Sequence, residues 1–160
     1  MGGDHAPEEI VAGALLAAQE FDVEVVLVGD EARVRSLLPC PVVDRITLVH
    51  APESIAMDLT PSTAARSCER TSLGVAVHLV KQGEADAVVS AGNSGAFVAI
   101  AFIKLRMIEG VSRPAIATVW PAINGPTILL DSGATVDCRP EWLEQFGVMG
   151  SAYALSLIHI

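Results

Sequence analysis

The chain reads Ser90-Ala91-Gly92-Asn93-Ser94-Gly95-Ala96 between two apolar segments. The segment before it, 87–90, has the composition of a buried strand, and the segment after it, 97–107, that of a helix. Glycines let a loop backbone approach a ligand closely, and the free N–H groups at the start of a helix attract anions. The loop is therefore a candidate phosphate site, with an ordinary tight turn as the alternative interpretation.

Helix-like and strand-like segments alternate on both sides of this loop. The composition predicts strands at 23–28, 46–49, 87–90, 115–119 and 127–130. It also predicts five helices. The first begins at Pro7, the second covers 31–38, and the third covers 62–82 with a break near 71–72. The fourth follows the glycine loop and ends near Gly110, and the fifth begins at Pro140. Asp30 and Gly83 are expected to cap helices, and Asn124-Gly125 to form a hairpin turn. This order predicts an α/β fold with a doubly wound, largely parallel sheet and helices on both faces.

A second loop of interest is Asp131-Ser132-Gly133-Ala134, which follows the predicted strand 127–130. Sheets of this class bind ligands beyond the carboxyl ends of their strands. Asp131 could orient a ligand hydroxyl or amide there, or it could simply cap its own loop.

Composition excludes several classes of function. The 160 residues are 51% apolar, which predicts one folded domain or a piece of one. The net charge of −9 and the aromatic content of 4% argue against nucleic-acid binding. No complete dinucleotide or P-loop glycine motif occurs, which counts against nucleotide binding. Six basic residues lie around the glycine loop: Arg66, Arg70, Lys81, Lys104, Arg106 and Arg113. They could prepare one face for an anion, although for most of them a solvated helix surface is the favoured interpretation.

The cysteines and histidines do not form a recognisable metal motif. Cys40, Cys68 and Cys138 have no metal-ligand spacing, and an odd number of cysteines suits a reducing compartment. No metal and no cofactor is therefore expected. The longest apolar run is far shorter than the roughly 20 residues that span a bilayer, so a cytoplasmic location is predicted.

Taken together, the short motifs resemble one family. In order, they are Met1-Gly2-Gly3-Asp4, Pro61-Ser62, Ser72 before a helix, Val80-Lys81-Gln82-Gly83, Ala85-Asp86-Ala87, Ser90 to Ala96, Arg113-Pro114-Ala115, Leu130-Asp131 with Gly133-Ala134, Asp137, and Gln145-Phe146 with Met149-Gly150. This succession resembles that of the bacterial phosphate acyltransferases of phospholipid synthesis, the PlsX family. The resemblance covers about residues 1–154, and the joint occurrence of the motifs makes it specific.

The resemblance implies transfer of a fatty acyl group from acyl carrier protein to inorganic phosphate. It implies a fold similar to those of isocitrate dehydrogenase-like proteins and phosphate acetyltransferases, a homodimer, and peripheral membrane association of the full-length protein. It places Asn93 and Ser94 in the catalytic centre. The remaining implied substrate-binding residues are Gly2, Gly3, Asp4, Ser72, Gly92, Gly95 and Asp131.

The chain departs from the family at its ends and at two loop positions. The family has a strand before the Met-Gly-Gly-Asp motif and a second half after the last helix, so the chain is expected to be the N-terminal part of such an enzyme. Residues 155–160 match nothing in the family and are interpreted as a foreign tail. Ser94 stands where Thr is common, and Thr135 where Asn is expected. This chain alone is predicted to be poorly stable or prone to aggregate.

Two further candidate groups and one alternative function stay open. His5 could protonate a leaving thiolate or could be an exposed loop residue, and Cys68 is a weaker candidate nucleophile. The alternative to an acyltransferase is a non-catalytic α/β module that binds phosphate or a nucleotide. In a third interpretation the glycine loop has no function.

Overall fold

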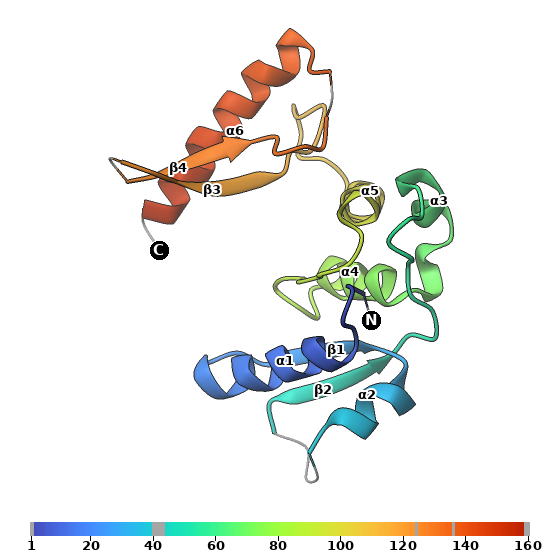
Figure 1. The fold of residues 1–160 in the computed structure, drawn as a ribbon. Helices are drawn as coiled ribbons and strands as arrows, with labels where there is room; N and C mark the ends of the chain where they lie inside the picture. The colour runs from blue at the N-terminus through green and yellow to red at the C-terminus, as the bar shows by residue number, and fades with distance from the viewer. Residues whose placement is uncertain (1, 40–43, 124, 136, 159–160) are drawn as a thin grey trace. The chain divides into compact units, whose positions relative to one another are not determined.

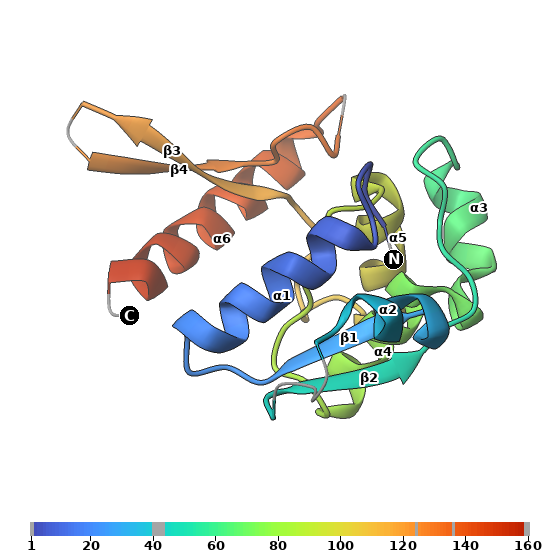
Figure 2. The same ribbon diagram turned by 60° about the horizontal axis from the view of Figure 1, so that its bottom comes forward.

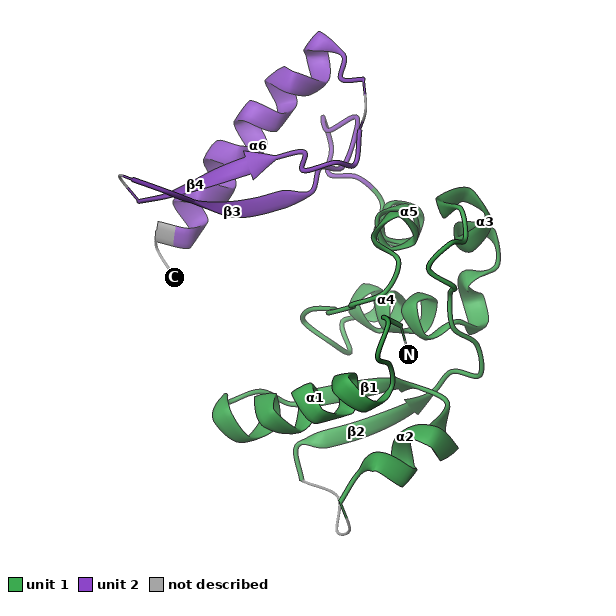
Figure 3. Cartoon of the chain, viewed as in Figure 1, with its two compact units in different colours: residues 1–106 green, residues 107–160 purple. Residues whose placement is uncertain are grey.

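The computed structural model describes residues 2–39, 44–123, 125–135 and 137–158. The chain divides into two compact units, residues 1–106 and residues 107–160 (Figure 3). The predictions that involve Met1, Cys40, Asn124 and residues 159–160 lie outside the described residues.

The first unit begins with a small parallel sheet covered by helices (Figure 1). Its elements are α1 (Glu8–Glu20), β1 (Val25–Gly29), α2 (Glu31–Leu37) and β2 (Ile46–His50). The two strands run parallel, with Val25 opposite Ile46 and Leu27 opposite Leu48. α2 begins at the predicted place because the carboxylate of Asp30 accepts a hydrogen bond from Arg33 N at 3.0 Å.

One face of this sheet packs against both α1 and α2. The buried residues of this core are Val11, Ala18, Leu27, Val34 and Ile46. Figure 2 shows α1 and α2 on the near side of the sheet and α4 behind it. α4 also contacts β1, so helices lie on both faces, as the sequence predicted.

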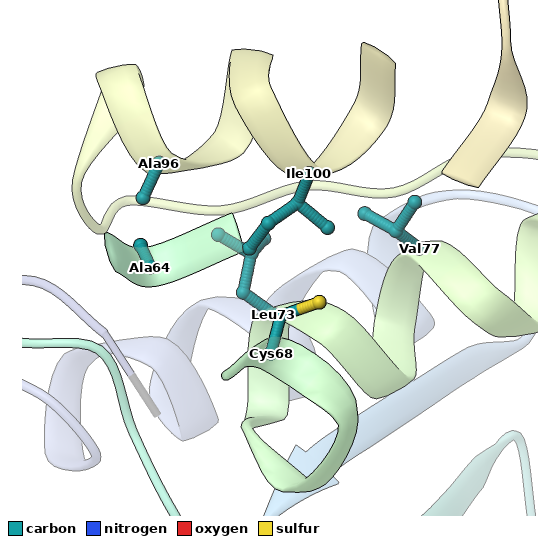
Figure 4. Packing of buried hydrophobic residues seen from close by; sticks show 6 residues of the cluster. All are labelled: Ala64, Cys68, Leu73, Val77, Ala96 and Ile100. Carbon is teal, nitrogen blue, oxygen red and sulfur yellow. The ribbon is translucent and has the colours of Figure 1, made fainter. Parts of the chain in front are cut away.

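The rest of the first unit is helical. It contains α3 (Pro61–Arg66), the 3₁₀ turn η1 (Cys68–Arg70), α4 (Ser72–Gln82) and α5 (Ser94–Leu105). The predicted break near 71–72 is confirmed, since Thr71 caps α4, and Gly83 ends α4 in the left-handed conformation with φ 74°. Figure 4 shows the core that joins these helices, formed by Ala64, Cys68, Leu73, Val77, Ala96 and Ile100.

Gly74 is required for the close approach of η1 to α4. A Cβ atom at this position would lie 1.8 Å from the carbonyl oxygen of Cys68. The same carbonyl accepts a hydrogen bond from the Thr71 hydroxyl at 2.9 Å, which holds the turn against the start of the helix. A side chain at residue 74 would therefore separate η1 from α4.

The second unit is a hairpin with one helix. β3 (Ala117–Ala122) and β4 (Gly125–Leu130) run antiparallel, with Val119 opposite Ile128, and α6 (Pro140–Ile158) packs on β4. Gly150 of α6 lies against Leu130, whose Cδ1 would be 3.1 Å from a Cβ at residue 150. α6 runs through residues 155–158, so the predicted boundary between residues 154 and 155 falls inside a helix.

The α/β class is confirmed, but three expectations differ from the structure. Residues 87–90 form no strand, because nothing in the described part of the chain pairs with their backbone, and Val89 is 96% exposed. α5 ends at Leu105 rather than near Gly110, because Arg106 adopts a positive φ of 68°. The described strands form two separate two-stranded sheets, of which only one is parallel.

None of the helices that the structure describes has both the length and the apolar composition needed to cross a membrane.

Candidate functional site

The glycines near the N-terminus pack directly on the glycine loop. A Cβ at Gly2 would lie 3.3 Å from the Cα of Gly92. A Cβ at Gly3, whose φ is +108°, would lie 3.1 Å from the carbonyl oxygen of Ala91. Two segments separated by about ninety positions in the sequence therefore meet backbone to backbone, so closely that a side chain at either glycine would crowd the opposite backbone. The structure thus brings together two of the segments to which the sequence assigned a phosphate site.

Asn93 fixes the glycine loop in place. Its Oδ1 accepts a hydrogen bond from Ala96 N at 2.9 Å and caps α5. Its Nδ2 lies within donating distance of three carbonyl oxygens, those of Ala56 at 3.3 Å, Met57 at 3.0 Å and Leu59 at 2.9 Å. Since the amide has two N–H bonds for three acceptors, the whole side chain is engaged in holding the 56–59 segment against α5. This favours a positioning role for Asn93.

The start of α5 has N–H donors that find no acceptor within the described part of the chain. Ala96 N is bound by Asn93 Oδ1, and Phe97 N donates to Asn93 O at 3.0 Å. The N–H groups of Ser94 and Gly95 have no hydrogen-bond acceptor among the residues described. Ser94 and Gly95 are both exposed, and Ser94 also carries a hydroxyl group. These groups, at the positive end of a twelve-residue helix, can bind an oxyanion.

A shallow pocket of about 200 Å³ adjoins the contact between the two glycine segments. Its lining consists of Gly2, Gly3, Ala6, Arg33, Ser54, Ile55, Ala56 and Met57. Two of these residues, Ala56 and Met57, provide two of the three carbonyls that accept from Asn93. The same asparagine therefore caps α5 and holds one wall of the pocket.

The remaining predicted residues of the first unit lie in different settings. Asp4 and His5 are exposed, beside the glycines. Ser72 is buried at the start of α4, where its N–H donates to Glu53 O at 2.8 Å, and it does not line the pocket. Cys68 belongs to the helical core, with 3% of its surface exposed, which does not favour a nucleophilic role.

The basic residues near the glycine loop are partly neutralised. Arg70 pairs with Glu53 at 3.3 Å, and Lys104, whose side chain is 10% exposed, pairs with Glu69 at 3.0 Å. The hydrogen bond and the positive charge from Lys104 lower the pKa of Glu69. These two cations of the predicted basic cluster therefore serve internal ion pairs.

Asp131 lies in the second unit. Its Oδ1 accepts a long hydrogen bond from Ile116 N at 3.4 Å, and its Oδ2 is buried with no partner among the described residues. Gly133 forms the predicted turn, with φ +89° and its N–H donating to Asp131 O at 2.8 Å. Thr135, which stands where Asn was expected, accepts from Arg113 Nε at 2.7 Å. The loop that begins at Asp131 is therefore held by contacts within the second unit.

Sequence patterns did not identify Arg33 or Ser54 as pocket residues. Arg33 lies outside the basic cluster between residues 66 and 113, and Ser54 belongs to a loop without a motif. Both join the glycines through contacts between segments far apart in the chain, which periodicity and spacing cannot reveal. Among the described residues, no group of three or more His, Cys, Asp or Glu side chains is placed to hold a metal ion.

Comparison with known proteins gives a consistent result. Residues 1–160 match the family described as "Fatty acid synthesis protein". The chain is 53% identical to a phosphate acyltransferase of Nostoc punctiforme over 157 residues, which cover 96% of this chain and 46% of the relative. It is 48% identical to a phosphate acyltransferase of Desulfitobacterium hafniense strain Y51 over 161 residues, covering 100% of this chain and 48% of the relative. The chain thus spans about half the length of these curated relatives.

Proposed function

The chain belongs to the fatty acid synthesis protein family, and we propose that the complete protein transfers a fatty acyl group from acyl carrier protein to inorganic phosphate. The product is an acyl phosphate, used in phospholipid synthesis. The names of its relatives, phosphate acyltransferases at about 50% identity, support this reaction class.

The structural observation that carries the proposal is the contact of Gly2 and Gly3 with Ala91 and Gly92 beside the free N–H groups of α5. Phosphate is already anionic at neutral pH, so an enzyme needs mainly to bind it and direct one oxygen at the thioester. Backbone N–H groups fixed at a helix start perform this task without reorganisation.

The reaction requires no covalent enzyme intermediate. A phosphate oxygen attacks the thioester carbonyl carbon, the carbonyl oxygen becomes an oxyanion, and the C–S bond then breaks. The proton of the hydrogen phosphate passes to the departing thiolate, so the products are acyl phosphate and the free thiol. Because a thiol has a pKa near 8.5, the thiolate leaves without prior protonation. The main task of the protein is therefore to stabilise the oxyanion.

We assign distinct roles to the residues of the loop. Ser94 is the proposed catalytic residue, through its hydroxyl and N–H, and the Gly95 N–H is a second donor. Asn93 is a positioning residue, because its side chain is occupied by four backbone groups. Gly2, Gly3 and Gly92 shape the site, with Asp4 at its border. Ser72 and Asp131 remain predicted substrate-binding residues.

The broader properties implied by the family are part of the same proposal. The complete protein is expected to have the doubly wound, largely parallel sheet of the isocitrate dehydrogenase-like and phosphate acetyltransferase folds. It is expected to be a cytoplasmic homodimer that associates with the membrane surface.

The test is phosphate-dependent release of free thiol from acyl carrier protein. The protein assayed is a designed chimera in which this chain replaces the matching segment of the Nostoc punctiforme relative. We expect thiol release that rises with phosphate and does not occur with sulfate, an anion of similar shape and poor nucleophilicity. An anion that binds without any thiol release would instead favour the non-catalytic binding module.

A further inference from the structure

Arg33 lines the pocket beside the glycines. Three other arginines of the first unit form ion pairs: Arg35 with Glu31 at 2.6 Å, Arg45 with Asp22 at 2.7 Å and Arg70 with Glu53 at 3.3 Å. In the described part of the chain, Arg33 forms no such pair, and its backbone N–H, not its guanidinium, contacts Asp30. Because Arg33 lines a concave surface and is exposed, its guanidinium can bind an external anion.

The rest of the lining is compatible with an anion. No carboxylate lines the pocket, and Arg33 is the single charged residue among the lining residues that the structure describes. Ser54 can donate a hydroxyl hydrogen bond, while Gly2 and Gly3 leave room for a ligand to approach the backbone. Ile55, Ala56 and Met57 add an apolar wall on one side.

The size of the pocket limits the ligand. Its volume of about 200 Å³ is well above the roughly 30 Å³ share of one water molecule and below the roughly 300 Å³ at which pockets for drug-sized ligands begin. A phosphate-sized group fits within it, whereas a whole fatty acyl chain does not.

From these observations we propose that the Arg33 pocket binds the phosphoryl group of a substrate, with the Arg33 guanidinium as its counter-charge and Ser54 as a second donor. This inference rests on the proposed function and adds a binding residue that lies outside the glycine loop. The phosphoryl group has two sources in that reaction, free inorganic phosphate and the phosphodiester in the prosthetic arm of the carrier protein. Contact of the pocket with Gly2 and Gly3, which pack on the glycine loop, favours the free phosphate.

The test compares Arg33→Ala with Arg35→Ala in the chimera. Arg35 lies on the same helix but is paired with Glu31 and does not line the pocket, so its variant is the matched control. We expect Arg33→Ala to raise the KM for phosphate about tenfold, as the loss of a charge-assisted hydrogen bond predicts for an exposed guanidinium. Arg33→Lys should restore part of the affinity, and Arg35→Ala should leave the KM values unchanged.

A second measurement identifies the source of the phosphoryl group. A second outcome in Arg33→Ala is a rise of the KM for acyl carrier protein in place of the KM for phosphate. If this rise disappears when the acyl donor is an acyl pantetheine that lacks the phosphodiester, the pocket binds the carrier's prosthetic arm. The proposal that the pocket binds a phosphoryl group then stands. Equal KM values for both substrates in wild type and Arg33→Ala would overturn the proposal while leaving the acyltransferase function intact.

Titration of inorganic phosphate into the full 160-residue chain tests binding without turnover, and Arg33→Ala should weaken that binding by a similar factor. Failure of the wild-type chimera to release thiol would count against the proposed function alone.

Discussion

The Nδ2 atom of Asn93 lies 2.9 Å from the carbonyl oxygen of Leu59 and connects the start of α5 to the 56–59 segment. Asn93→Ala removes this bond and the helix cap together. A lost cap and the lost hydrogen bond to a partly buried carbonyl each cost about 1 kcal/mol, so we expect the free energy of unfolding to fall by about 2 kcal/mol. Urea denaturation of the chimera measures this loss.

The controls for Asn93 separate its two contacts. Asn93→Ser keeps an oxygen that can cap α5 but cannot reach the three carbonyls as a donor, so it should retain part of the stability. Asn93→Asp keeps the cap but sets a carboxylate against carbonyl oxygens, and it should be less stable than Asn93→Ser. Equal stability of Asn93→Asp and wild type would show that the contacts with the 56–59 segment contribute nothing.

Gly74→Ala should destabilise the protein by about 3 kcal/mol or more, because the added Cβ would overlap the Cys68 carbonyl oxygen at 1.8 Å. The control is Gly13→Ala in α1, where no atom lies within 4 Å of the added methyl group. Alanine is favoured over glycine in a helix, so Gly13→Ala should stabilise the protein by up to about 1 kcal/mol. Opposite shifts of the thermal midpoint are expected, and a shift in the same direction for both variants would contradict the packing described for η1 and α4.

The ion pair of Lys104 and Glu69 should make stability depend on acid pH. Lys104 lowers the pKa of Glu69 below its ordinary value of 4.5 in the folded protein. The stabilisation is therefore fully present above the unfolded pKa and is lost as the pH falls through the lowered folded pKa. Glu69→Gln should be less stable than wild type at pH 7 and should approach it in acid. Measurement of the unfolding midpoint between about pH 7 and pH 3 tests this, and a constant difference across that range would exclude the pair as its cause.

Ser94→Ala should lower kcat/KM of the chimera by about 10²-fold if the hydroxyl donates to the oxyanion. Ser94→Thr keeps the hydroxyl and should retain most of the activity. Because Ser94 is exposed, neither variant should change the unfolding midpoint appreciably. Full activity of Ser94→Ala would leave the backbone N–H groups as the only donors of the loop.

The isolated chain is expected to self-associate. Several large apolar side chains are strongly exposed, among them Val89 at 96%, Ile108 at 77% and Ile123 at 103%. Such side chains favour association with other apolar surfaces. Light scattering after size-exclusion chromatography should detect species larger than one chain, and a monodisperse monomer with a cooperative melt would contradict this prediction.

Local features of the fold could be predicted from the sequence, and features that depend on distant segments could not. Asp30 and Gly83 cap helices as predicted, because side-chain capping and the left-handed preference of glycine act within a few residues. The end of α5 was missed because Arg106, not a glycine, takes the positive φ. The segment 87–90 has a strand's composition, but a strand also requires a neighbour, which composition does not specify.

The candidate site shows the same difference between features set by local sequence and features set by contacts between distant segments. The glycines at residues 2, 3 and 92 were predicted to border one pocket, and the structure places them in backbone contact. Asn93 was predicted to belong to the catalytic centre, and the structure shows its amide engaged with the 56–59 segment, which favours a positioning role there. Partners of a polar side chain depend on the tertiary structure, so sequence motifs could not predict these contacts.

The most direct test of the central claim is ³¹P NMR of the chimera supplied with acyl carrier protein bearing a fatty acyl group and with inorganic phosphate. We expect a new acyl phosphate signal that grows in step with free thiol, is greatly reduced in Ser94→Ala, and is absent with sulfate in place of phosphate. Thiol release at the same rate without phosphate, with free fatty acid as the product, would identify a thioesterase and contradict the proposed acyl transfer.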